Sequence, residues 1–295
     1  MPGKLMLLVN PAAGKGGFRS AMGDVLETFC KAGWLPTVFM TQARGDTPRL
    51  VCAHAADYDM VVCLGGDGTL SEVVTGLVTL PDAPPVGYIP MGTANDVATT
   101  LNLSKVPARA AAAITCGRPR PLDVGCMNGT DYFTYIAAFG AFTDVSYETR
   151  QESKQALGLL AYLLEGIAAL PKISPYHAVV EWDGGVIEDD FVFGGAANST
   201  SIAGMVKLDD SIVSLEDGLF EIILVKNPRT LMDMNAIVRD VLTKKYQTPH
   251  VTVLHSRRVR FTFDKPAKWT RDGESGGLHT DVTLENLNHA VHIVL

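Results

Sequence analysis

The stretch that decides the fold of this chain reads Val61-Val62-Cys63-Leu64-Gly65-Gly66-Asp67-Gly68-Thr69-Leu70-Ser71-Glu72. Its valine-rich beginning predicts a buried strand. Three glycines around one aspartate follow, and Thr69 is placed to cap a helix whose apolar residues recur at helical spacing. A strand, a glycine turn and a helix N-terminus direct backbone N–H groups toward an anion. Asp67 would repel phosphate unless a cation stands between them, so the stretch predicts a nucleotide bound with Mg²⁺. The alternative for this segment alone is a tight turn with an exposed Asp67.

The composition is that of a globular protein with room for two domains. The chain has 295 residues, of which 47% are hydrophobic and 19% charged, and its formal net charge is −7. A negative chain is a poor partner for nucleic acid. No apolar run is long enough to span a bilayer, and the N-terminal residues show no cleavage-site pattern. The five cysteines form no C-x-x-C pair, which favours reduced thiols and a cytoplasmic location over a zinc site.

Strands alternate with helices in the first part of the chain. The pattern predicts strands at residues 4–9, 37–41, 61–64 and 85–89, with helices at 18–33 and 50–56 and after residues 69 and 96. This alternation predicts a doubly wound parallel sheet. Three of its strand-to-helix loops carry glycine together with Asn, Asp or Thr. Such loops gather at the carboxyl ends of the strands, where ligands bind in folds of this class.

The pattern changes after residue 120. Short apolar segments joined by turns such as Asp183-Gly184-Gly185 predict a mostly antiparallel β domain. The predicted strands are 122–125, 132–139, 178–182, 191–195, 219–225, 251–254, 259–263 and 291–295, and the predicted helices are 154–170 and 232–242. The fold class is therefore α/β followed by β. We expect a nucleotide-binding domain at 1–120 and a second domain at 121–295, whose last strand returns to the first domain.

Six motifs in order resemble the diacylglycerol kinase catalytic-domain family, the bacterial lipid kinases related to sphingosine kinases. They are Asn-Pro-x-x-Gly at 10–14, Gly-Gly-Asp-Gly-Thr at 65–69, Pro-x-Gly-Thr-x-Asn-Asp at 90–96, Lys-x-x-Leu-Gly at 154–158, Asp-Gly-Leu-Phe at 217–220 and Asp-Gly-Glu at 272–274. The more distant NAD kinases share the first three. The resemblance runs nearly from end to end and implies a β-sandwich second domain that takes the lipid substrate.

The resemblance also implies which residues bind ATP, with Mg²⁺ screening the phosphate charge. Carried over by position, the nucleotide-binding residues are Asn10, Lys15, Thr41, Gly65, Gly66, Asp67, Gly68, Thr69, Leu70, Ser71 and Thr93. Many relatives have Asn where this chain has Ser71, which weakens the assignment of Ser71. The loop around Lys15 lacks the Walker A spacing, so Lys15 is not given the role of a Walker lysine.

Asp67, Asp272 and Glu274 are the expected catalytic residues. A lipid hydroxyl that attacks the γ-phosphoryl group must lose its proton, and Asp272 is the candidate base. Glu274 lies two residues on, and both side chains would point to the same side if the segment were a strand. The sequence leaves open which of the two is the base. An ordinary turn at Arg271-Asp272-Gly273 with solvated acids is the alternative.

Two further sets follow from the resemblance. Lys15, Asp67, Asp123 and Lys154 match a network of charges across the cleft between the domains, although each alone would be typical of a solvated surface. Ser214, Asp217 and Leu219 match a structural metal site made of one carboxylate and main-chain carbonyl groups. A simple turn at Asp217-Gly218 is the alternative to that site.

The sequence thus predicts an ATP-dependent lipid kinase that converts diacylglycerol to phosphatidate. Sphingosine, phosphatidylglycerol or NAD are alternative acceptors, and a nucleotide- or lipid-binding protein without turnover is the alternative from another class. We expect a cytoplasmic protein that visits the inner membrane surface transiently, with helix 154–170 beside the acyl chain. The sequence leaves open whether the protein forms a homodimer.

Overall fold

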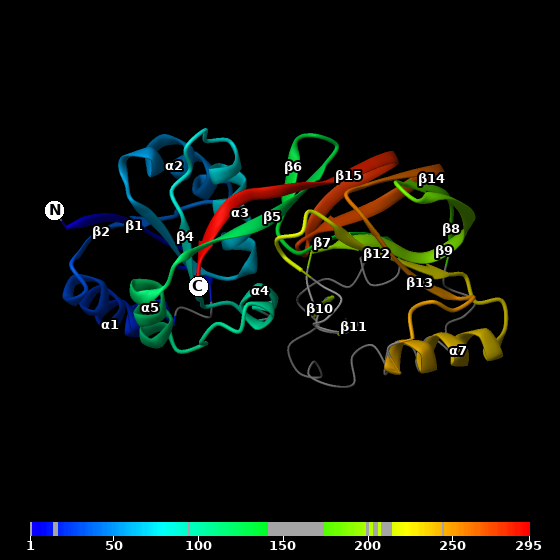
Figure 1. Ribbon diagram of the computed structural model, residues 1–295, viewed down its shortest axis with the longest axis horizontal. Coiled ribbons are helices and arrows are strands. Elements are labelled where there is room, and N and C mark those ends of the chain that lie inside the picture. The colour runs from blue at the N-terminus through cyan, green and yellow to red at the C-terminus, as the bar shows by residue number, and fades with distance from the viewer. Residues whose placement is uncertain are drawn as a thin grey trace. The chain divides into compact units, whose positions relative to one another are not determined.

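A computed structural model of the chain divides into two compact units, which are described separately (Figure 1). Unit 1 comprises residues 1–124, 132–134 and 287–295, and unit 2 comprises residues 125–131 and 135–286. The described residues are 2–13, 17–93, 95–140, 174–198, 201–202, 206–207, 214–243 and 245–295. The predicted helix 154–170 lies outside them, as do Lys15 and Lys154.

Unit 1 is built on a parallel sheet in the order β2-β1-β3-β4, with the end of β15 beside β4. The strands are β1 (Gly3–Val9), β2 (Trp34–Met40), β3 (Met60–Gly65), β4 (Val86–Pro90) and β15 (Glu274–Val294). The helices are α1 (Phe18–Lys31), α2 (Asp46–His54), η2 (Ala55–Asp57), α3 (Asp67–Val78), α4 (Asp96–Thr100) and α5 (Pro107–Cys116). The predicted parallel α/β fold is therefore confirmed. Strand β2 starts three residues before its predicted position, and α2 starts four residues early.

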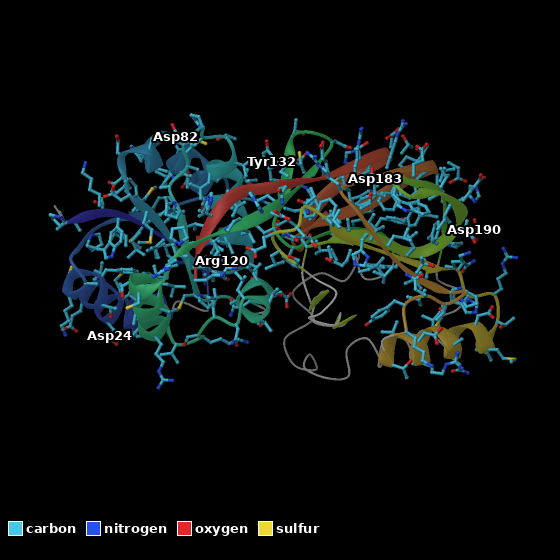
Figure 2. All side chains as sticks on the ribbon, in the orientation of Figure 1. Asp24, Asp82, Arg120, Tyr132, Asp183 and Asp190 are labelled. Carbon is cyan, nitrogen blue, oxygen red and sulfur yellow. The ribbon has the colours of Figure 1, made fainter. Side chains whose placement is uncertain are left out.

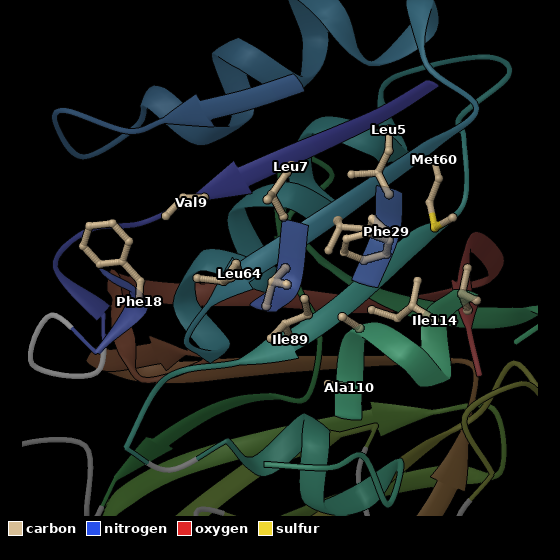
Figure 3. Close-up of a cluster of buried hydrophobic side chains, with 14 residues drawn as sticks. Leu5, Leu7, Val9, Phe18, Phe29, Met60, Leu64, Ile89, Ala110 and Ile114 are labelled. Carbon is tan, nitrogen blue, oxygen red and sulfur yellow. The ribbon is translucent and has the colours of Figure 1, made fainter. Parts of the chain in front are cut away.

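Alternating residues of the central strands divide the core of unit 1 between the two faces of the sheet. Leu5, Leu7 and Val9 of β1 pack with Phe29 of α1 and Ile114 of α5 (Figure 3). These strand side chains are fully buried, and each buried leucine contributes about 1.5–3 kcal/mol to stability. On the other face α2 packs against α3, so closely that a Cβ at Gly76 would lie 2.7 Å from Val51. Helices therefore cover both faces of the sheet of unit 1.

Unit 2 is an antiparallel β structure in which each of two long strands pairs with three other strands. Strand β9 (Gly185–Ala197) pairs with β8 (Tyr176–Trp182), β7 (Ile136–Gly140) and β12 (Phe220–Lys226). Strand β14 (Arg258–Arg271) pairs with β8, β7 and β15. The remaining elements of unit 2 are β10 (Ser201–Ile202), β11 (Val206–Lys207), α7 (Leu231–Leu242) and β13 (Val251–Ser256), whereas β5 (Pro119–Met127) and β6 (Asp131–Phe133) contribute residues to both units.

An aromatic cluster fills the inner face of unit 2. The ring centroid of Phe139 lies 4.8 Å from that of Phe263 and 5.2 Å from that of Trp269. The ring of Phe261 packs against the rings of Phe139 and Trp269. The predicted turn between β8 and β9 is also present. Its Asp183, which is labelled in Figure 2, accepts a 2.6 Å hydrogen bond from the Ser256 hydroxyl group. These contacts give unit 2 its own core, as the predicted β domain requires.

The prediction of one strand at 132–139 was wrong. The structure has two strands there, β6 and β7, and the chain between them changes direction at Thr134 and Tyr135. The backbone N–H groups of Tyr135 and Ile136 bind the side chain of Asp272 instead of a neighbouring strand. The side chain of Asp272, which is distant in sequence, therefore interrupts the predicted strand.

Candidate functional site

Two strand-to-helix loops of unit 1 meet backbone against backbone at the carboxyl ends of β3 and β4. The Met91 N–H donates to the Gly65 carbonyl oxygen at 2.7 Å, and a Cβ added to Gly92 would lie 2.8 Å from the Cα of Gly66. A Cβ at Gly65 would likewise lie 2.6 Å from the Cβ of Thr69. Glycine is needed at these positions because any side chain would force the loops apart.

Thr69 does not cap helix α3, so that expectation was wrong. The helix begins at Asp67 with Gly66 as its N-cap residue, and Thr69 is buried in the first turn. Its Oγ1 accepts a 3.0 Å hydrogen bond from the Nδ2 of Asn10, which follows β1. The Oδ1 of Asn10 accepts the N–H of Ala12 at 3.0 Å. Asn10 and Thr69 thus join the loop after β1 to the loop after β3.

Asp67 joins the beginnings of two helices. Its Oδ2 accepts the N–H of Asp96 at 3.2 Å and its Oδ1 accepts the N–H of Val97 at 3.3 Å. The Tyr88 hydroxyl group lies 3.5 Å from the same Oδ1. Burial, together with the Asp67 carboxylate, raises the pKa of Tyr88, so this phenol stays protonated and donates. Asp67 is therefore a fixed, half-buried negative charge at the start of α3, and the exposed-turn alternative does not describe it.

Asn95 is a site residue that sequence reasoning did not select, although it lies within a quoted motif. It has a positive φ of 53°, and its side chain is buried. Its Oδ1 accepts the N–H of Gly92 at 2.9 Å and its Nδ2 donates to the Gly92 carbonyl oxygen at 2.8 Å. The motif itself, with a small polar residue before a helix, was the available signal.

The other residues expected to bind nucleotide differ in their burial and in the groups that they could present to a ligand. Thr41 is buried at the end of β2, and its hydroxyl group lies 3.4 Å from the Val9 carbonyl oxygen. Thr93 is exposed. The Leu70 side chain is in the core, and its backbone N–H donates to the Gly66 carbonyl oxygen at 3.0 Å, so both groups are already used within the chain. Gly68 and Ser71 lie half-buried on the first turns of α3.

Asp123 is buried within unit 1, where amide groups bind its carboxylate. Its Oδ1 accepts the Nδ2 of Asn288 at 3.0 Å and the N–H of His289 at 2.8 Å. His289 has a positive φ of 56°, which marks an irregularity in β15. Asp123 thus fixes the backbone where β15 bends.

Asp272 and Glu274 do not lie together in one strand, so the condition under which both side chains would point to the same side is not met. Asp272 and Gly273 form the two-residue turn between β14 and β15, with φ values of 46° and 84°. Asp-Gly is a preferred pair for such hairpin turns. Asp272 is 6% exposed, whereas Glu274 is exposed at the first position of β15.

The carboxylate of Asp272 is held by the backbone. Its Oδ1 accepts the N–H of Tyr135 at 3.0 Å and the N–H of Ile136 at 3.1 Å. The N–H of Asp272 in turn donates to the Ile136 carbonyl oxygen at 2.9 Å. Three hydrogen bonds therefore fix both the turn and the direction of its side chain.

The expected cation loop enters β12. The Asp217 Oδ1 accepts the N–H of Leu219 at 3.0 Å, and the hydroxyl group of Ser214 lies 3.4 Å from the N–H of Glu216. No group of three His, Cys, Asp or Glu side chains positioned for a metal occurs among the described residues. A cation here would depend on one exposed carboxylate together with hydroxyl, amide and main-chain oxygens.

Two buried side chains stand next to this loop. The Nδ2 of Asn286 donates to the Leu219 carbonyl oxygen at 3.0 Å, while its Oδ1 lacks a hydrogen bond to any described residue. Glu221 is fully buried, and neither carboxyl oxygen bonds to another described residue. Burial, with the Asp217 carboxylate as a further cause, raises the pKa of Glu221 to about 8. Oxygens of this kind are the ligands of Mg²⁺ and Ca²⁺, so the loop fits a divalent cation.

Comparison with known proteins matches both parts of the chain. The profile of the diacylglycerol kinase catalytic domain matches residues 4–127, and that of the YegS C-terminal NAD kinase beta sandwich-like domain matches residues 138–294. A diacylglycerol kinase of Bacillus subtilis (strain 168) is 30% identical over 98% of this chain and 95% of its own. One of Staphylococcus carnosus (strain TM300) is 33% identical over 92% of this chain and 88% of its own.

Solved structures share the fold. A diacylglycerol kinase from Bacillus anthracis str. Sterne aligns with a TM-score of 0.77 over 99% of this chain and 96% of its own, at 24% identity. A second structure from the same organism aligns with a TM-score of 0.82 at 25% identity, over 99% of this chain and 97% of its own. Of the helices whose residues the structure describes, none is long and apolar enough to cross a membrane.

Proposed function

This chain belongs to the diacylglycerol kinase family, and we propose that it transfers the γ-phosphoryl group of ATP to the free hydroxyl group of a diacylglycerol, giving phosphatidate and ADP. The single observation that carries the proposal is Asp272, a buried carboxylate fixed by two backbone N–H groups. A hairpin turn of Asp-Gly forms without burying its acid, so a function is the better explanation of that burial.

We assign the nucleotide to the loops of unit 1. Backbone N–H groups at the start of α3 are directed toward an anion, and the glycines leave room for phosphate oxygens. Asn10, Thr41, Thr69, Ser71 and Thr93 add polar groups around the same loops. Lys15 stays a proposal from the resemblance, because it lies outside the described residues.

Asp67 is the residue we assign to Mg²⁺. Its carboxylate already accepts two N–H groups of the backbone, so contact with the ion through water fits the observed bonds. When bound, Mg²⁺ would neutralise charge on the β- and γ-phosphates. Asp67 would hold that ion in place because Tyr88, Asp96 and Val97 fix its carboxylate.

Asp272 is the residue we assign as general base. The oxygen of the lipid hydroxyl group forms a bond to the γ-phosphorus, the bond from that phosphorus to the β–γ bridging oxygen breaks, and the hydroxyl proton passes to Asp272. Glu274 is exposed two residues on, which suits contact with the acceptor or with a metal-bound water. We assign Asp123 and Lys154 to the expected network of charges. Asp123 contributes a carboxylate that is held by amide groups.

We also propose that the protein meets its substrate at the inner surface of the membrane and leaves it again. The acceptor is a membrane lipid, and no described helix is able to span a bilayer. The net charge of −7 provides no long-range attraction to anionic lipid, so contact would be brief and local.

The test is a transfer assay with ATP labelled in its γ-phosphoryl group. Diacylglycerol, sphingosine, phosphatidylglycerol and NAD are offered in turn, with Mg²⁺ or with a chelator. The proposal expects labelled phosphatidate that disappears on chelation. Label in another acceptor would change the substrate, and label in none would support a binding protein without turnover.

A further inference from the structure

A cavity of about 220 Å³ lies in unit 1 between α5, the loop 101–106 that leads into α5, and the end of β15. Its floor is apolar and buried, because Ala110, Ile114 and Val294 are each at most 5% exposed (Figure 3 labels the first two). Leu101 and Leu103 of the loop complete the apolar lining. Cavities with such a lining do not hold ordered water, and they bind apolar molecules.

The cavity reaches the surface of the molecule. Ala113 on α5 and Asn102 in the loop both line it, and both are exposed. A cavity of about 150 Å³ with a similar lining in another protein holds one benzene molecule, so by proportion this one has room for roughly eight carbon atoms. A single short aliphatic chain therefore fits, and a polar group at its end would stay at the surface.

The rim of the cavity carries basic side chains. Lys105 and Arg109 each adjoin a lining residue in the chain. The backbone of Arg118 exchanges two hydrogen bonds, of 2.8 and 3.1 Å, with that of Leu295, which also lines the cavity. All three basic side chains are exposed, and none of them forms an ion pair or hydrogen bond with another described residue. They are therefore available to an anion from solution.

The charge around the cavity is opposite to that of the whole chain. Between Asp96 and Asp123 there are four basic residues and no acidic one, whereas the chain as a whole carries −7. Helix α1 packs against α5 and adds no net charge, because it contains two basic and two acidic residues. A local excess of positive charge raises the concentration of anions at the rim.

We propose that this cavity binds one aliphatic chain whose anionic head group is held at the rim by Lys105, Arg109 and Arg118. The ligand class is a medium-chain fatty acid in its carboxylate form. A free fatty acid fits better than a membrane lipid, because the cavity has room for one short chain and not for two long ones. None of the lining residues is assigned to ATP or to the acceptor hydroxyl group, so the site goes beyond the proposed function.

The experiment is isothermal titration calorimetry of the full-length protein, without nucleotide, against sodium hexanoate, sodium octanoate and octan-1-ol. We expect octanoate to bind the wild type with a dissociation constant of about 1 mM or lower. Hexanoate should bind more weakly by about fourfold for each missing methylene group. Octan-1-ol should bind more weakly than octanoate, and added NaCl should narrow that difference because it screens the exposed charges.

The first variant fills the cavity. Ala113→Phe places a large side chain at an exposed position of the lining, and we expect the affinity for octanoate to fall by about tenfold or more, as displacing two methylene groups would do. Ala112→Phe is the matched control, because Ala112 is exposed on the same helix and does not line the cavity. It should bind octanoate as the wild type does.

The second variant removes charge from the rim. Lys105→Gln combined with Arg109→Gln should lower the affinity for octanoate by about threefold to tenfold and leave that for octan-1-ol unchanged. Lys4→Gln is the control, because it removes an exposed cation from β1, which does not line the cavity.

Three results would overturn the inference. One is a wild type that does not bind octanoate, and another is octanoate binding that Ala113→Phe leaves unchanged. The third is a protein that ignores octanoate but sediments with vesicles of phosphatidylcholine and phosphatidylglycerol through Lys105 and Arg109, since the basic rim would then contact a membrane. None of these measurements involves phosphoryl transfer, so this inference and the proposed function can fail separately.

Discussion

Replacing Asp272 by Asn and by Ala should separate its chemical role from its structural role. The carboxylate oxygen Oδ1 accepts two backbone N–H groups, at 3.0 and 3.1 Å, and the residue has a positive φ of 46°. Asn keeps an oxygen at the side-chain end and tolerates a positive φ nearly as well as Asp. Ala keeps neither property.

The structure sets the size of each effect. In Asp272→Asn both hydrogen bonds can persist, so we expect stability to change by less than about 1 kcal/mol. The amide does not accept a proton, so kcat should fall by about 10²–10⁴. In Asp272→Ala two buried N–H groups lose their acceptor, at about 1–3 kcal/mol each, and the left-handed backbone adds about 1 kcal/mol. That variant should lose roughly 3–7 kcal/mol of stability.

The assays are urea unfolding and transfer of labelled phosphate to diacylglycerol in detergent micelles. Glu274→Gln is the matched control, because it makes the same chemical change at an exposed position two residues on. If Asp272→Asn keeps wild-type kcat, Asp272 is not the base. If Glu274→Gln shows the large loss and Asp272→Asn does not, the two residues have exchanged roles.

Three further predictions concern other carboxylates and one histidine. Asp67→Ala should abolish turnover, because the positioning of Mg²⁺ is lost. The same variant should lose only about 1 kcal/mol of stability, since two N–H groups at the start of α4 lose their acceptor. A near-normal kcat in the transfer assay would remove Asp67 from the mechanism. Asp217→Ala should lower the melting temperature more in Mg²⁺ than in chelator, and equal losses would argue against a bound metal. Hydrogen bonds to Asp190 (labelled in Figure 2) and then Glu188 raise the pKa of His177, so the stability they give is complete below the ordinary histidine pKa and is lost as pH rises through the raised value. Wild type should therefore lose stability relative to His177→Gln across that window in melts at stepped pH, and parallel pH curves would contradict the assignment.

The parallel sheet of unit 1 could be predicted because its signals are local. Valine-rich strands, glycine loops and helical spacing all lie within a dozen residues of each other, as at Val61 to Glu72. The helix α7, which begins with a capping box between Thr230 and Asp233, follows the same kind of local rule.

The bonds that shape the site could not be predicted in the same way. Asp67 bonds to residues 29 and 30 positions along the chain, and Asp272 to residues 136 and 137 positions away. Periodicity carries no information about such contacts. Thr69 had the residue type of a cap, but its side chain is needed beside Gly65 to bind Asn10.

The turn at Asp272 had an available signal. Asp272-Gly273 between two alternating strands is a strong hairpin sequence, and it places Asp272 in a turn and Glu274 at a strand start. Strand alternation therefore does not apply across that pair, because the pair forms a turn.

The most direct measurement of the central claim is the transfer of labelled γ-phosphate by the wild-type protein to diacylglycerol. The account predicts labelled phosphatidate that depends on Mg²⁺ and is lost with Asp67→Ala and with Asp272→Asn. Label that persists in both variants, or that reaches no lipid, would contradict it.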